Sequence, residues 1–396
     1  MINSDVKEKL GEYKYLMNLN SVESLVRKQA AEIVSSLRYG VAPDKGVLKF
    51  SVGREEILHI IKQDLKYVQN GKSKLRFFNG CYGSGKTHTL YLLRELAFKN
   101  NFASSFITLT TRECPMSDFG TVYSHIVKSL RTDSCRDMPA LEMIIQNWCE
   151  KILTLGLDNP KLVLQKLKKL SPDFQNVLTA YVEPSKKEPW RIKELAIRWI
   201  QGDLNNFRDS KTVGAKSYAC DATSLEMLQN LVLMLKIIGF NGMVILLDEA
   251  ESIPCISKFS KIQNAYDNLG RLINCNFETT NLYFIYATTP LFFEELGKDR
   301  LLNIKDENII NLQPLPKSSL QQLAIHIRDL HIQSYNWTNI SRLIRQNLLN
   351  YVDMFLRTCK GSTLARNFVK AMVTSLDICQ ENPKLTLLET IKSIKL

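Results

Sequence analysis

The segment with the clearest chemistry is rich in glycine and lies between an apolar run and a helical pattern. It fits GxxxxGK[ST] at every fixed position and reads Gly80, Cys81, Tyr82, Gly83, Ser84, Gly85, Lys86 and Thr87. Such glycines let the backbone curl until its N–H groups face phosphate oxygens, and the helix that follows adds the positive end of its dipole. We therefore predict a phosphate-binding loop for ATP, with a plain glycine-rich turn as the alternative.

The last residues of this loop carry its charge and its metal-binding oxygen. Lys86 is expected to contact the β- and γ-phosphates, and the hydroxyl of Thr87 is expected to bind Mg²⁺. His88 follows directly and is grouped with the nucleotide-binding residues, although a lone histidine here is most simply placed facing solvent.

Two adjacent acids, Asp248 and Glu249, end the apolar run Met243–Leu247. An unpaired buried carboxylate is costly, and a Mg²⁺ ion beside the phosphate loop would supply the missing positive charge. We predict that Asp248 holds the metal through water and that Glu249 orients or deprotonates the attacking water. The alternative is an ordinary strand end with solvated acids. A glutamate here favours hydrolysis over nucleotide storage.

Two threonines end the next apolar run, in Ala287-Thr288-Thr289-Pro290. A hydroxyl at this point is suited to hydrogen-bond the γ-phosphate or the attacking water. Thr289 is the first candidate and Thr288 the second. Threonine is also common in strands because its branched side chain suits them, which is the alternative explanation.

Three arginines have roles that the sequence leaves open. Arg300 is either a charge that one subunit offers to a neighbour's nucleotide or a solvated surface residue. Arg366, at the start of a helical pattern in the C-terminal tail, either reaches the phosphates or faces solvent. Arg54 precedes the helix ahead of the loop and either shapes the adenine pocket or makes a helix-start contact.

These residues must be positioned by strands and by the helices between them. Short apolar runs typical of strands cover residues 75–79, 105–109, 243–247 and 282–287, and helical spacing covers 87–98 and 262–275. Fully apolar strands that alternate with helices indicate a parallel sheet covered on both faces. The predicted fold class is therefore α/β, a P-loop sheet with helices.

The chain outside this sheet is predicted to be helical. We expect an N-terminal extension over 1–45, an ATPase core over 46–312 with a helical insertion at about 131–225, and a helical lid domain over 313–396. Helical spacing in these parts covers residues 22–37, 318–330, 339–357 and 363–379.

Composition narrows the class of protein further. The chain has 396 residues, 45% of them hydrophobic, which is enough to bury a core. Nine cysteines without a CxxC pair argue against structural zinc and, with a polar N-terminus, predict a reducing, cytoplasmic location. No run approaches the roughly 18 apolar residues of a membrane helix, so we expect no membrane span.

The net charge of +12 suits an anionic partner, first of all nucleic acid, and the alternative is that the charge only keeps the chain soluble. The basic stretches at 164–170 and 185–188 are the candidates for direct contact with DNA. A solvated helix face is the alternative for each.

The order of these motifs resembles that of AAA+ ATPases of the initiator and helicase-loader type. The resemblance is closer to the ATP-binding proteins of bacterial BREX phage-defence operons, of the BrxD type. Four stretches carry it: LRYGVAPDKGVLKFSVGREEI (37–57), FFNGCYGSGKTHTLYLLRELAF (77–98), IRWIQGD (197–203) and MVILLDEAESI (243–253). The RYGVAP-to-VGRE block and RWIQGD single out this family, since phosphate-loop motifs are common to many.

The resemblance implies an ATPase that works with a helicase or another operon product on DNA. It carries over Gly80, Gly85, Lys86 and Thr87 for nucleotide binding and Asp248 and Glu249 for catalysis. The segment 131–195 and the last 70 residues match less well. The Pro- and Cys-bearing stretch after Glu251 and the middle segment depart from the family's pattern, which leaves the partner surface open.

We therefore predict an ATP-binding and ATP-hydrolysing protein whose nucleotide state controls a DNA-acting partner. An oligomer is expected because Arg300 would complete a neighbour's site. Two alternatives stay open: a nucleotide-gated scaffold with little turnover, and a helicase loader or replication initiator outside defence. The latter would be expected to carry a winged-helix domain after the lid, and only about 20 residues follow Cys379.

Overall fold

The computed structural model describes most of the chain in full detail. The residues described are 26–154, 168–183, 188–204, 206–274, 281–299, 304–337, 343–359, 361, 363–391 and 394.

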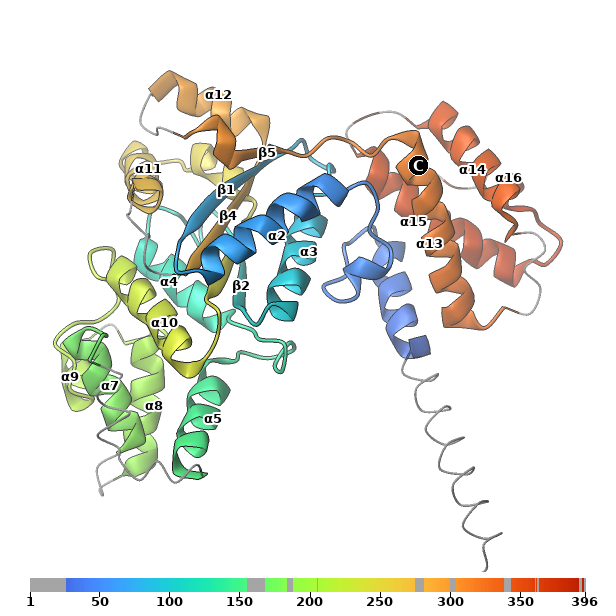
Figure 1. The fold of residues 1–396 in the computed structure, drawn as a ribbon. Coiled ribbons are helices and arrows are strands. Elements are labelled where there is room, and N and C mark those ends of the chain that lie inside the picture. The colour runs from blue at the N-terminus through green and yellow to red at the C-terminus, as the bar shows by residue number, and fades with distance from the viewer. Residues whose placement is uncertain are drawn as a thin grey trace, which may run out of the picture. The chain divides into compact units, whose positions relative to one another are not determined.

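The centre of the fold is a five-stranded parallel sheet with the strand order β2-β3-β4-β1-β5 (Figure 1). Its strands are β1 (Lys74–Asn79), β2 (Ala103–Thr108), β3 (Met243–Asp248), β4 (Leu282–Thr288) and β5 (Ile309–Asn311). Every residue of β3 and β4 is buried, as the continuous apolar runs predict. The predicted α/β class with a parallel sheet is confirmed.

Strand β5 is the strand that the sequence analysis did not predict. It has three residues and pairs with the end of β1, where Asn79 aligns with Asn311. A run of this length is too short to show the alternation by which strands are recognised.

Helices pack on both faces of the sheet, as two tyrosines of β4 show. The hydroxyl of Tyr283 donates to Asp64 on one face, and the hydroxyl of Tyr286 donates to the carbonyl of Ala250 on the other. Because successive side chains of a strand point to opposite faces, residues three apart lie on different sides. Helix α2 (Glu55–Gln69) precedes β1. The other helices that flank the strands along the chain are α3 (Lys86–Lys99), α4 (Phe119–Lys128), α10 (Ser224–Ile238), α11 (Phe259–Asn274) and α12 (Pro290–Asp299).

The predicted helical insertion lies between β2 and β3. Its described helices between α4 and α10 are α5 (Leu141–Thr154), α7 (Pro172–Val182), α8 (Pro189–Ile200) and α9 (Phe207–Thr212). Phe174 of α7 and Trp199 of α8 pack edge to face with ring centroids 5.2 Å apart, and both are buried. The segment is therefore a packed part of the hydrophobic core.

The chain forms two compact units. One contains Glu56–Gly80 and Leu93–Leu312, which include the sheet and the insertion. The other contains the chain up to Glu55, the segment Cys81–Leu92 and the chain from Gln313 onward.

The second unit is helical. It contains a helix at 26–38 and the helices α13 (Lys317–Tyr335), α14 (Arg345–Thr358), α15 (Leu364–Glu381) and α16 (Leu387–Thr390). Arg38 forms an ion pair with Asp377 of α15 at 2.8 Å, and Asp377 also accepts from the ring of His331 on α13. These contacts join the N-terminal helix to the C-terminal helices. In the part of the chain that the structure describes, no helix is long and apolar enough to cross a membrane.

Candidate functional site

The glycine-rich segment connects a strand to a helix, as predicted. Strand β1 ends at Asn79, and α3 begins at Lys86. Gly83 and Gly85 have φ angles of 83° and 91°, in the left-handed region that side chains disfavour. Lys86 is only 7% exposed although it is a lysine. The two glycines thus give the loop the curled backbone that a phosphate-binding loop needs.

Arg54 lies directly against this loop. Its Nη2 donates to the carbonyl of Ser84 at 2.5 Å, and its Nη1 donates to the carbonyl of Gln313 at 3.0 Å. The side chain is 6% exposed, and this burial lowers the pKa of its guanidinium. A positive charge is therefore held under the loop by two backbone carbonyls, and its observed role is to support the loop.

Arg366 of α15 also contacts the loop. Its Nε donates to the carbonyl of Gly40 at 3.0 Å, and its Nη1 donates to the hydroxyl of Tyr82 at 2.5 Å. The guanidinium carbon lies 5.3 Å from the centre of the Tyr82 ring. Arg366 thus reaches the second variable position of the loop from a C-terminal helix, while its contact with phosphates stays a prediction.

His88 is half-buried, whereas the sequence analysis placed it facing solvent. Its ring lies 5.2 Å from the ring of Phe50, and its Nε2 lies 3.3 Å from Oγ of Ser51. Burial and the positive charge of Arg54 lower the pKa of His88 to about 4. The first turn of α3 packs against residues 50–54, a contact that the local sequence does not reveal. The ring is neutral at neutral pH and offers no charge to a phosphate.

The two acids stand at the end of β3. Asp248 is the last residue of the strand and is 4% exposed, and its Oδ1 accepts from the N–H of Glu249 at 3.0 Å. Glu249 is exposed and has a φ angle of 54°, in the left-handed region. The chain therefore turns sharply at this point and leaves one acid buried and the next in solvent.

Two unsatisfied polar atoms lie at the ends of β4 and β1. Thr288 is fully buried, and its Oγ1 has no hydrogen-bond partner among the described residues. Asn79 aligns with Thr288 across the strands, and its Oδ1 is also buried and without a partner there. Its Nδ2 donates to Oδ1 of Asn311 at 2.8 Å. Thr289, the first candidate of the sequence analysis, lies one residue beyond the strand and is half-buried.

A family model gives the decisive comparison. Residues 25–395 match the model described as BREX system ATP-binding protein BrxC/D. The chain belongs to the BrxC/D family. A solved structure of the Aeropyrum pernix ORC2 protein, in ADPNP and ADP complexes, is similar at 13% identity and a TM-score of 0.47. That likeness covers 86% of this chain and 67% of the ORC2 chain. A search of curated proteins found no match.

Three residues of this BrxC/D protein that belong to the predicted site lie at one edge of the sheet. Strands β1, β3 and β4 are parallel, so Gly80, Asp248 and Thr288 lie at the same edge of the sheet. The N–H of Gly80 donates to the carbonyl of Thr288 at 3.1 Å, which fixes the start of the loop at this edge. Buried oxygens with unused hydrogen-bonding capacity, such as Oγ1 of Thr288, are costly unless a ligand or water meets them.

Sequence reasoning missed one residue of the site, and another residue that it predicted lies outside the described part of the chain. Asn79 was missed, although a polar residue that ends an apolar strand directly before Gly80 was a usable signal. Arg300 lies outside the described residues, so its role stays a prediction. Of the two basic stretches, only residues 168–170 and Glu188 are described.

Proposed function

We propose that this BrxC/D protein binds ATP with Mg²⁺ and hydrolyses it, and that the nucleotide state controls a DNA-acting partner in phage defence. The observation that carries the proposal is the phosphate loop. Its glycines take left-handed backbone angles, its lysine is buried, and a buried arginine supports it. Family membership supports ATP binding. ATP hydrolysis, the DNA-acting partner and a cytoplasmic location are inferences from that membership.

Each residue of the site has its own role in the proposed hydrolysis of ATP. The loop N–H groups and Lys86 bind the phosphates, and the hydroxyl of Thr87 is a metal ligand. Mg²⁺ neutralises phosphate charge when bound. Asp248 would hold the metal through water, and Glu249, exposed at the strand end, would accept a proton from the attacking water.

The hydroxyl at the end of β4 orients the attacking water or contacts the γ-phosphate. Thr288 is favoured for this role because its Oγ1 is buried and unused among the described residues. Thr289 stays the alternative. Arg366 and Arg300 remain proposed contacts to the phosphates, Arg300 from a neighbouring subunit.

Phosphate release, measured against protein concentration with and without DNA, tests the proposal. Native protein should turn over ATP, and the Lys86→Ala variant should not. A turnover that rises per subunit with concentration supports an oligomer and a role for Arg300. Tight ATP binding with no release in any of these conditions would instead favour the scaffold, and no binding at all would refute the site.

A further inference from the structure

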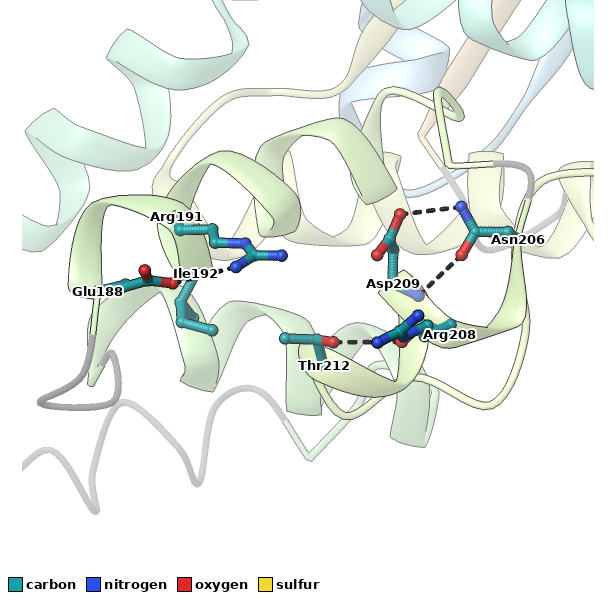
Figure 2. Close-up of a pocket in the computed structure, with 7 residues that line it drawn as sticks. All are labelled: Glu188, Arg191, Ile192, Asn206, Arg208, Asp209 and Thr212. Carbon is teal, nitrogen blue, oxygen red and sulfur yellow. Dashed lines mark hydrogen bonds and ion pairs between the residues drawn. The ribbon is translucent and has the colours of Figure 1, made fainter.

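A polar pocket lies far along the chain from the phosphate loop, between α8 and α9 of the insertion (Figure 2). Its volume is about 730 Å³, and two arginines, Arg191 and Arg208, line it from the two helices. Figure 2 labels both arginines among the residues that line the pocket. A pocket lined by guanidinium groups is suited to phosphate oxygens.

Two large aromatic side chains stand next to these arginines in the sequence. Trp190 is 66% exposed and Phe207 is 46% exposed, although both residue types are usually buried. The Nζ of Lys211 lies 4.6 Å from the centre of the Phe207 ring. We call Trp190, Arg191, Phe207, Arg208 and Lys211 the α8–α9 surface.

The charge of this part of the insertion is positive. Over 188–204 and 206–216, the exposed basic residues are Arg191, Lys193, Arg198, Arg208, Lys211 and Lys216, and the exposed acids are Glu188 and Glu194. The acids of the pocket already have partners, since Glu188 pairs with Arg191 at 3.1 Å and Asp209 accepts from Asn206 at 2.9 Å. An anionic partner is therefore favoured over a basic or neutral one.

We propose that the α8–α9 surface binds single-stranded nucleic acid. Arg191, Arg208 and Lys211 contact the phosphates, and unpaired bases stack on Trp190 and Phe207. Bases in a duplex are already stacked on one another, so exposed rings of this kind favour a single strand. The proposal goes beyond nucleotide turnover and does not depend on it.

Fluorescence anisotropy with a labelled single-stranded DNA oligonucleotide tests the proposal, with single-stranded RNA and duplex DNA as further arms. The Trp190→Ala and Phe207→Ala changes together should weaken binding by about 100-fold, since one stacked base contributes about 10-fold or more. Tyr67→Ala is the matched control, because Tyr67 is a 50% exposed aromatic residue on α2. The control should leave the affinity unchanged.

The contribution of the basic side chains is tested by measuring how the affinity for the same oligonucleotide depends on salt concentration. Arg208→Gln and Lys211→Gln should each lower the slope of log affinity against log salt by about 0.7 for a single strand. Arg345→Gln, at an exposed arginine of α14, should leave the slope unchanged.

Tryptophan fluorescence distinguishes direct contact with the oligonucleotide from an effect of the substitutions on folding. Trp190 is exposed, whereas Trp148 and Trp199 are buried and Trp337 is half-buried in the other unit, so oligonucleotide binding should quench chiefly Trp190. Trp190→Phe should remove most of the quenching and keep the affinity within about 3-fold, because phenylalanine still stacks. The Lys86→Ala variant should bind the oligonucleotide as the native protein does, which keeps this test apart from the ATPase test.

Several results would overturn the proposal. One such result is that the variant with both Trp190→Ala and Phe207→Ala binds the oligonucleotide as tightly as native protein, and that the oligonucleotide still quenches the fluorescence of the Trp190→Phe variant. Another is duplex DNA that binds as tightly as the single strand, because it would leave the rings no role. Equal binding of DNA and RNA single strands agrees with the proposal, which names only chemistry that they share.

Discussion

The phosphate loop and the α8–α9 surface are proposed to bind anions in opposite ways. The loop uses backbone N–H groups fixed by glycines in left-handed conformations, with buried Lys86 and Arg54 beside them. The proposed α8–α9 surface uses long, exposed side chains on two helices. The loop therefore suits one small ligand in one geometry, whereas the surface suits a polymer whose phosphates arrive in many positions.

This difference means that the two functions should separate cleanly by mutation. Variants of the loop and of β3 should change nucleotide binding or turnover and leave oligonucleotide binding as it is. Variants of the α8–α9 surface should do the reverse.

Glu249→Gln should give the largest effect. The amide cannot accept a proton from water, so ATP turnover should fall by about 100- to 1,000-fold while nucleotide affinity stays within a few-fold. Phosphate release and binding of a fluorescent ATP analogue measure the two quantities. Glu294→Gln, at another glutamate of the sheet unit, serves as the control. Equal losses in binding and turnover would assign Glu249 to folding or binding instead of catalysis.

Lys86→Ala should come next. Loss of a charged contact to the phosphates should weaken ATP binding by about 100-fold. Calorimetric titration with Mg·ATP measures it, with Lys62→Ala at an exposed lysine of α2 as the control. Unchanged ATP affinity would contradict the site, and a parallel loss of oligonucleotide binding would contradict the separation of the two regions.

Arg54→Met should have an intermediate effect. It removes two hydrogen bonds from a buried position and leaves the carbonyls of Ser84 and Gln313 without this donor. We expect the free energy of unfolding to fall by about 1–3 kcal/mol and ATP affinity to fall by about 10-fold. Urea unfolding and nucleotide titration measure these changes. Arg54→Lys should restore only part of both, because a single ammonium lacks the guanidinium fork.

The smallest expected effect concerns pH. Because the pKa of His88 is lowered to about 4 in the folded chain, the unfolded chain takes up this proton first as the pH falls below about 6.5. His88 therefore lowers stability progressively between pH 6.5 and pH 4, by about 2 kcal/mol at pH 5. The His88→Gln variant should lose less stability between pH 7 and pH 5 than native protein in urea unfolding.

His59→Gln, at an exposed histidine of α2, is the control for the pH experiment. It should lose as much stability as native protein over the same interval. If His88→Gln behaved like this control, burial of the His88 ring would not be the source of the acid sensitivity.

The loop and the strands could be predicted from sequence because backbone geometry restricts which residues are allowed. A left-handed turn at Gly83 and Gly85 needs glycine, and the buried strand β3 needs an unbroken apolar run. Both requirements act on neighbouring residues, so they leave a local pattern.

Features that depend on distant contacts left no such pattern. His88 packs on Phe50, and Arg54 reaches Gln313, which is 259 residues away. The exposure of Trp190 and Phe207 depends equally on how α8 and α9 pack against the rest of the insertion. Asn79 is the exception, because its place directly before the loop was visible and only its unused oxygen was not.

Because the backbone at Glu249 is left-handed, the residue that would give the greatest thermal stability at this position differs from the residue needed for activity. A residue with a Cβ atom pays about 1 kcal/mol for this conformation, and glycine does not. Random variants screened only for survival on heating should therefore accumulate glycine at position 249. Those survivors would melt later than the parent and, on the proposed chemistry, would have lost the base that activates water.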